Sequence, residues 1–116
     1  MKYSDEQRIQ KIYEYAEKLL TYISQNDITK EKLLTDYALQ WLVTTPLYNI
    51  GEQVYALSDE YKMSHGEIPW SMISGLRHRL VHDYDGTNWN IITAVVFDEL
   101  PTLLKQLEDL TINRNC

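Results

Sequence analysis

Residues 4–24, SDEQRIQKIYEYAEKLLTYIS, show the pattern that most of this chain follows. Apolar residues recur there at spacings of three and four, which places them on one face of an α-helix; they are Ile9, Ile12, Tyr13, Ala16, Leu19, Leu20 and Ile23. Ser4 followed by Gln7 is a capping-box pattern, which marks the start of a helix. We therefore expect an amphipathic helix over about residues 5–24.

Three further segments show the same helical period. The second runs from about residue 29 to 61 and contains Pro46, so this helix should be kinked or broken in two there. The third, about 69–81, begins at Pro69, and the fourth, about 89–110, has Asn88 as its cap and a bend at Pro101. Because no segment alternates with the period of a strand, we expect an all-α fold, an antiparallel bundle of four to five helices.

Length and composition are typical of one folded domain. The chain has 116 residues, of which 44% are hydrophobic and 24% charged, so we expect a single domain, ordered over about residues 4–110. The longest apolar runs last only a few residues, which predicts no membrane span and no secretory segment. The single cysteine, Cys116, excludes an intramolecular disulfide and a Cys-rich zinc site. These features favour the cytoplasm.

The net charge restricts contact with nucleic acid. The chain carries 11 Lys and Arg against 17 Asp and Glu, which gives a formal net charge of −6. Broad electrostatic binding of nucleic acid needs a basic face. Any contact with RNA or DNA must therefore be local.

The most polar stretch is residues 77–84, RHRLVHDY. Arg77 and His82 lie five positions apart, about 140° around a regular helix, so they would not share a face. We therefore expect His82 at the end of the helix, where a guanidinium and an imidazole could converge on one anion, with Tyr84 on the loop beyond. The negative end of the helix dipole favours a protonated histidine at this position.

This stretch resembles the motif R-x4-H-x-Y of the HEPN superfamily, and specifically the HepT-like toxins of bacterial and archaeal toxin–antitoxin pairs. Arg77, His82 and Tyr84 fill the three motif positions, and His78 follows the arginine. Flanking phrases are also similar, so the resemblance spans roughly residues 4–110; they lie at 50–52, 68–70, 75–76, 85–86 and 98–101. Relatives often carry an arginine several residues before the pair at 51–52, where this chain has residues 44–46, TTP.

The resemblance implies metal-independent cleavage of RNA, in which the 2′-hydroxyl attacks the adjacent phosphate. Arg77 and His82 would be the catalytic residues, with His78, Arg79 and Asp83 supporting the cleft. The residue types fit this chemistry, because histidine exchanges protons near neutral pH and arginine offers a fork of donors to a phosphate. The resemblance implies no metal and no cofactor.

One histidine cannot be both the acid and the base of such a reaction. The resemblance therefore implies a homodimer that brings two motifs to one cleft. We expect its interface to include the helices at 69–81 and 89–110, because Trp70, Met72 and Ile73 lie near the motif.

The family resemblance also implies a partner, an MNT-type nucleotidyltransferase antitoxin that inhibits the toxin by AMPylation of the motif tyrosine, here Tyr84. A nucleotide attached two residues from His82 would add charge and bulk where an RNA phosphate must lie. The alternative function is a non-catalytic nucleotide- or protein-binding subunit of a nucleotidyltransferase complex.

Simpler roles remain open for individual residues. Arg79 and Asp83 are spaced as an exposed helix pair, and His65 has no partner at a suitable spacing. His78 and His82 are spaced to share a metal ion, but no third ligand is evident. We assign the three tryptophans to packing and to an interface rather than to stacking of bases; they are Trp41, Trp70 and Trp89.

Overall fold

The computed structural model describes residues 2–82 and 87–115, and the side chains of residues 2–80 and 87–111. The described residues contain helices and no strand, which confirms the all-α prediction. None of the described helices is long and apolar enough to span a membrane. The elements are α1 (Asp5–Gln25), α2 (Lys30–Thr35), α3 (Tyr37–Ala56), α4 (Asp59–Ser64), α5 (Trp70–His82), α6 (Trp89–Ala94), the π-helical turn η1 (Val95–Glu99) and α7 (Leu100–Asn115).

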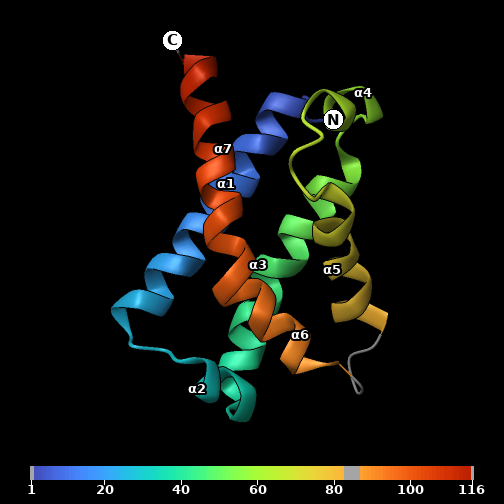
Figure 1. The fold of residues 1–116 in the computed structure, drawn as a ribbon. Helices are drawn as coiled ribbons and strands as arrows, with labels where there is room; N and C mark the ends of the chain where they lie inside the picture. Colours follow the sequence, from blue (N-terminus) through green and yellow to red (C-terminus); the bar gives the residue numbers. More distant parts are fainter. Residues whose placement is uncertain (1, 83–86, 116) are drawn as a thin grey trace.

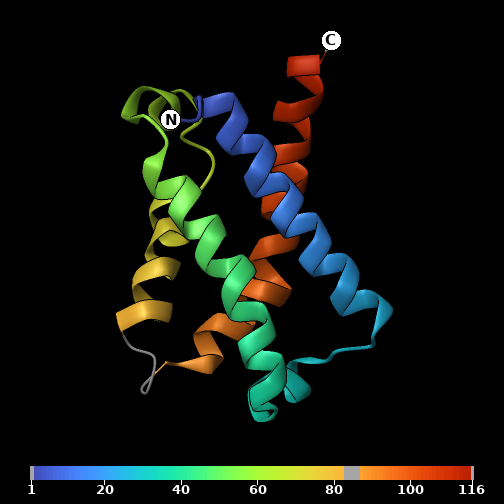
Figure 2. The same ribbon diagram turned by 180° about the vertical axis from the view of Figure 1, so that it is seen from behind.

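The long helices form an antiparallel bundle (Figure 1). Helices α1 and α5 run in one direction and α3 and α7 in the other, so the two ends of the chain lie at the same end of the bundle (Figures 1 and 2). The most extensive contacts join α3 to α5, α1 to α3, and α1 to α7. Helix α3 is therefore central, with α1 on one side and α5 on another.

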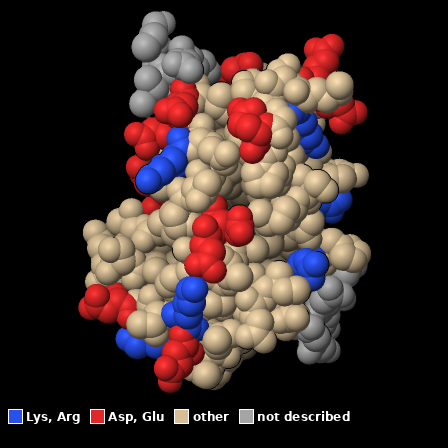
Figure 3. Space-filling model, viewed as in Figure 1, with Lys and Arg blue, Asp and Glu red and all other residues tan. Residues whose placement is uncertain are grey.

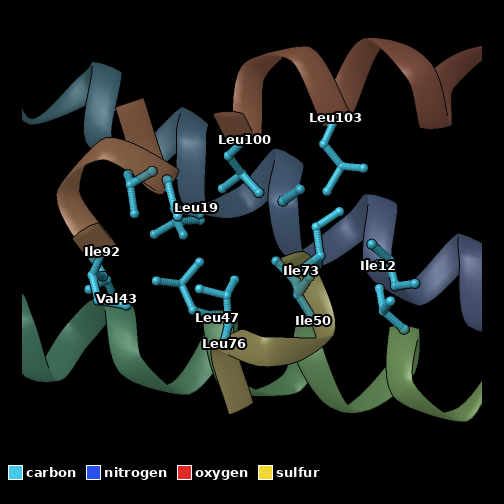
Figure 4. Close-up of a cluster of buried hydrophobic side chains, with 14 of the residues drawn as sticks. Ile12, Leu19, Val43, Leu47, Ile50, Ile73, Leu76, Ile92, Leu100 and Leu103 are labelled. Carbon is cyan, nitrogen blue, oxygen red and sulfur yellow. The ribbon is translucent and has the colours of Figure 1, made fainter. Parts of the chain in front are cut away.

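The core lies between these helices and is apolar. Figure 4 shows side chains of α1, α3, α5, α6 and α7 pointing toward one another. They include Ile12, Leu19, Val43, Leu47, Ile50, Ile73, Leu76, Ile92, Leu100 and Leu103, all of which are buried. Burying a Leu or Ile side chain stabilises a fold by about 1.5–3 kcal/mol, so this cluster holds the helices together.

Helix α1 begins as the sequence predicts. The backbone N–H of Gln7 donates to Ser4 Oγ at 3.1 Å, and the N–H of Ser4 donates to Gln7 Oε1 at 2.8 Å. These two bonds complete the capping box. The helix then runs to Gln25, one residue beyond the predicted end.

The segment 29–61, predicted as a helix kinked or broken in two at Pro46, is three helices, and the first break comes at Asp36. The Asp36 carboxylate accepts from the backbone N–H of Ala38 at 2.9 Å and of Leu39 at 3.4 Å, which caps a new helix. Helix α3 continues through Pro46 without a break. The second break comes at Ser58, whose hydroxyl accepts from the N–H of Tyr61 at 3.1 Å and caps α4.

The last predicted helix is divided by a π-helical turn. Asn88 caps α6 as expected, because its side chain accepts from the N–H of Asn90 at 3.1 Å and of Ile91 at 3.4 Å. The turn η1 lies just before Pro101, which has no N–H to donate to the carbonyl of Phe97. At the place where a bend was expected the helix has a wider turn, and α7 extends from Leu100 to Asn115.

Candidate active site

Helices α3 and α5 approach closely at Gly51. A Cβ atom at this residue would lie 2.9 Å from the backbone nitrogen of Arg77, 3.2 Å from Arg77 Cβ and 3.3 Å from the carbonyl oxygen of Ile73. A contact of 2.9 Å with backbone is too short to be relieved by a side-chain rotation. The missing side chain of Gly51 therefore fixes the distance at which α5 presents Arg77.

The guanidinium of Arg77 is held by two side chains of α3. Arg77 Nε lies 3.3 Å from Glu52 Oε1, and the guanidinium carbon lies 4.0 Å from the centre of the Tyr55 ring. The side chains of Arg77 and Glu52 are 29% and 41% exposed, so each contact is worth only about 0–1 kcal/mol. Together they orient the arginine while leaving part of it open to solvent. Because Glu52 contacts Nε, the terminal N–H groups can serve an anion.

Helix α5 is described as far as His82, and residues 83–86 lie outside the described residues, so the predicted end of the helix at His82 stays a prediction. Arg77 and His82 are five positions apart, which on a regular helix is about 7.5 Å along the axis and about 140° around it. The backbone therefore does not place both residues on one face. The side chain of His82 lies outside the described residues, so the convergence of the two groups stays a prediction.

The other predicted site residues fall into two groups. His78 and Arg79 lie on α5 and are exposed. Asp83 and Tyr84 lie outside the described residues, so the pairing of Arg79 with Asp83 and the position of the motif tyrosine stay predictions. Among the described residues, no three His, Cys, Asp or Glu side chains lie together in a way that could hold a metal ion.

The tryptophans take different positions. Trp70 is buried, and its indole N–H donates to the carbonyl of His65 at 3.0 Å; Trp89 is half-buried against the core. Trp41 is 70% exposed, so its assignment to packing is wrong within a single chain.

His65, expected to be without a partner, stacks on Tyr61 with ring centres 4.4 Å apart and contacts the Tyr61 carbonyl through Nδ1 at 3.0 Å. The reason is that His65 follows α4 directly and caps it.

Charges of both signs are dispersed over the surface. On the face shown in Figure 3, Asp and Glu side chains lie among Lys and Arg side chains, and the basic side chains form no continuous patch. This pattern agrees with the net charge of −6. An RNA strand would find isolated cations on this face rather than a basic track.

Comparison with known proteins shows the family. The family model described as "Ribonuclease HepT-like" matches residues 7–110. This chain belongs to the HepT-like family. A protein of Caldanaerobacter subterraneus named "Putative RNase" is 35% identical over 88 residues, which cover 76% of this chain and 74% of the relative. A Methanocaldococcus jannaschii protein with the same kind of name is 31% identical over 100 residues, covering 85% and 83%.

A third HepT-like relative is named for the family itself. "Probable ribonuclease HepT" of Thermococcus cleftensis is 31% identical over 84 residues, which cover 72% of this chain and 76% of that protein. No solved structure matches this chain.

Two site residues of this HepT-like chain are not found by motif reasoning, namely Glu52 and Tyr55. The phrase at 50–52 was recognised only as similar text, without a role. A signal was available, because Glu52 and Tyr55 are three residues apart and therefore lie on one side of a helix. The sequence does not show that this side faces Arg77.

Proposed function

We propose that this chain is a metal-independent endoribonuclease in which Arg77 binds the scissile phosphate and His82 transfers protons. The observation that carries the proposal is the orientation of the Arg77 guanidinium. Arg77 lies on α5, the helix that contains His82, and Glu52 and Tyr55 of α3 contact its guanidinium. Membership of the HepT-like ribonuclease family, whose relatives include proteins named "Putative RNase" and "Probable ribonuclease HepT", supports the proposal.

The reaction follows from these groups. A base removes the proton of the RNA 2′-hydroxyl, whose oxygen forms a bond to phosphorus. The bond from phosphorus to the 5′-oxygen breaks, and an acid gives that oxygen a proton. The products are a 2′,3′-cyclic phosphate and a 5′-hydroxyl end. Arg77 stabilises the charge that builds on the phosphate oxygens, and no metal is needed.

A homodimer would supply the second proton-transfer group. One copy offers one His82, whereas two copies facing one cleft offer a base and an acid. Of the three residues expected at this interface, Trp70 and Ile73 are buried in the core of the single chain and Met72 is exposed. Trp70 and Ile73 are therefore not available to a partner copy. If sedimentation showed a monomer at micromolar concentration and that monomer cleaved RNA fully, the dimer proposal would be wrong.

The test is cleavage of RNA in the presence of EDTA. We expect the unmodified chain to leave cyclic phosphate ends and the variants Arg77→Ala and His82→Ala to be inactive. Both variants should remain folded, because Arg77 is partly exposed and His82 is the last residue of α5. Inactivity of the wild type together with tight binding of a nucleotidyltransferase would instead favour the non-catalytic subunit.

We further propose that the RNase is the toxin of a toxin–antitoxin pair, restrained by an MNT-type nucleotidyltransferase that transfers AMP to Tyr84. The phenol oxygen would attack the α-phosphorus of ATP, forming a Tyr–O–P bond and releasing pyrophosphate. Intact-mass spectrometry after co-expression should show one or more AMP additions, absent in Tyr84→Phe. An unshifted mass, or a shift that persists in Tyr84→Phe, would leave inhibition to complex formation alone.

A further inference from the structure

A pocket lies beside the last turns of α5. Its volume is about 370 Å³, and it is lined by Gln40, Trp41, Thr44, Leu80, Thr87 and Trp89. Leu80 is three residues beyond Arg77, less than one turn along the helix, or about 4.5 Å along its axis. The residues from α3 lie near the start of that helix, and those at 87–89 lie at the start of α6. The motif helix thus contributes Leu80 to the pocket, whereas Glu52 and Tyr55, which contact Arg77, lie about 12 Å or more further along α3 than Thr44.

The most exposed wall of this pocket is the indole of Trp41. It is 70% exposed, and Tyr37, one turn earlier on α3, meets it edge to face with ring centres 4.8 Å apart and planes at 69°. An edge-to-face contact of this kind limits rotation of the indole and covers at most one of its two faces. A large apolar ring held in solvent marks a binding surface.

The remaining walls are preformed and partly polar. Gln40 Nε2 donates to the carbonyls of Leu33 at 3.0 Å and Leu34 at 3.2 Å, which anchors this side chain to the end of α2. Thr44 Oγ1 donates to the Gln40 carbonyl at 2.7 Å and keeps lone pairs that can accept. Trp89 packs against the core and forms an apolar wall. The lining therefore combines two indoles with amide and hydroxyl groups.

We propose that this pocket binds one base of the RNA strand, stacked on Trp41, in the same strand whose phosphate Arg77 contacts further along α3. This inference rests on the proposed RNase function. A nucleobase has a flat π face and an edge of donors and acceptors, which matches an exposed indole beside hydroxyl and amide groups. Exposed Leu34, Tyr37 and Leu42 surround Trp41 outside the pocket, but the pocket itself is concave and of mixed polarity, which suits a base better than the flat apolar surface of a second copy.

Binding of uncleavable RNA tests the proposal independently of catalysis. The probes are fluorescein-labelled 2′-O-methyl hexamers of adenylate and of uridylate, which lack the attacking hydroxyl, measured by anisotropy at one fixed low salt concentration. Trp41→Leu, which keeps apolar bulk without a π face, should weaken binding about 10-fold, whereas Trp41→Phe should stay within about threefold. Tyr22→Leu is the matched control, because Tyr22 is an exposed aromatic on α1, 43% accessible, and should have no effect.

The outcomes separate this inference from the RNase function. If the wild type binds the hexamers with Trp41 dependence but cleaves no RNA, the base pocket stands and the RNase function fails. If the wild type cleaves RNA but Trp41→Leu binds the hexamers as tightly, the pocket proposal is wrong and the function stands. Absence of wild-type binding also overturns the pocket. Sedimentation that shows Trp41→Leu dissociating a dimer would assign the surface to a second copy instead.

Discussion

Two arginines reach α3 from different helices, and their environments differ in charge. Arg8 of α1 donates from Nη1 to Gln53 Oε1 at 2.8 Å, and its guanidinium carbon lies 5.7 Å from the centre of the Tyr3 ring. Arg77 of α5 contacts the carboxylate of Glu52 at 3.3 Å and lies closer to an aromatic ring.

Consecutive residues of α3 therefore hold the two arginines, Gln53 toward α1 and Glu52 toward α5. A neutral amide is enough to fix an arginine that has only a packing role. A carboxylate hydrogen-bonds and orients a guanidinium and, in the absence of a bound phosphate, partly compensates its positive charge. The two arginines therefore differ in their polar partner on α3, a carboxylate for Arg77 and a neutral amide for Arg8, whereas both lie over an aromatic ring.

The largest expected effect comes from replacing each arginine by lysine. Arg77→Lys should lower kcat for RNA cleavage about 100-fold, because an ammonium cannot reproduce the planar fork of donors at the transition state. Arg8→Lys should change kcat by no more than about twofold. Single-turnover cleavage of one RNA substrate by both variants measures the difference.

Equal losses in the two lysine variants would show that the chemistry does not depend on the guanidinium of Arg77. Thermal unfolding of both variants serves as the control for folding. Arg8→Lys should cost about 1 kcal/mol of stability through its weaker bond to Gln53.

A smaller effect is expected from two glycine substitutions. Gly51→Ala should lower the free energy of unfolding by about 1–3 kcal/mol, because its Cβ would press on the backbone of Arg77. Gly75→Ala should raise it by about 0.5–1 kcal/mol, since a Cβ there meets nothing within 4 Å and alanine favours a helix. Urea denaturation measures both. Stabilisation by Gly51→Ala would mean that α3 and α5 do not need this close approach.

Much of this fold can be predicted from the sequence, because the apolar spacing of the long helices reports which face is buried. The capping residues Ser4 and Asn88 are also predictable, because each is recognised from its residue type directly before a helix. The break at Asp36 was missed because Pro46 is the stronger local signal, while the Asp36 cap competes with an apolar period that runs through it. The π-helical turn lies before Pro101, whose missing N–H is visible in the sequence, but the apolar spacing does not show that the helix answers with a wider turn.

The candidate site is predictable only along one helix. The motif and helical geometry place Arg77 and His82 on one helix, and the structure describes both on α5. The partners Glu52 and Tyr55 are more than 20 residues away in sequence, so their contact with Arg77 depends on how α3 and α5 pack. Gly51 controls that packing, and its role becomes visible only when the distance to α5 is known.

The smallest expected effect comes from exchanging the polar partners of the two arginines. Glu52→Gln should lower the free energy of unfolding by less than about 1 kcal/mol, because both members of the pair are partly exposed and the amide oxygen can still accept from Arg77. The informative quantity is the dependence on salt, since screening weakens an ion pair more than a neutral hydrogen bond. Urea denaturation at about 0.05 M and 0.5 M NaCl should show less salt sensitivity in Glu52→Gln than in the wild type, and more in Gln53→Glu, which gives Arg8 a charged partner. The same salt response in all three proteins would mean that the charge of Glu52 does not distinguish the environment of Arg77 from that of Arg8.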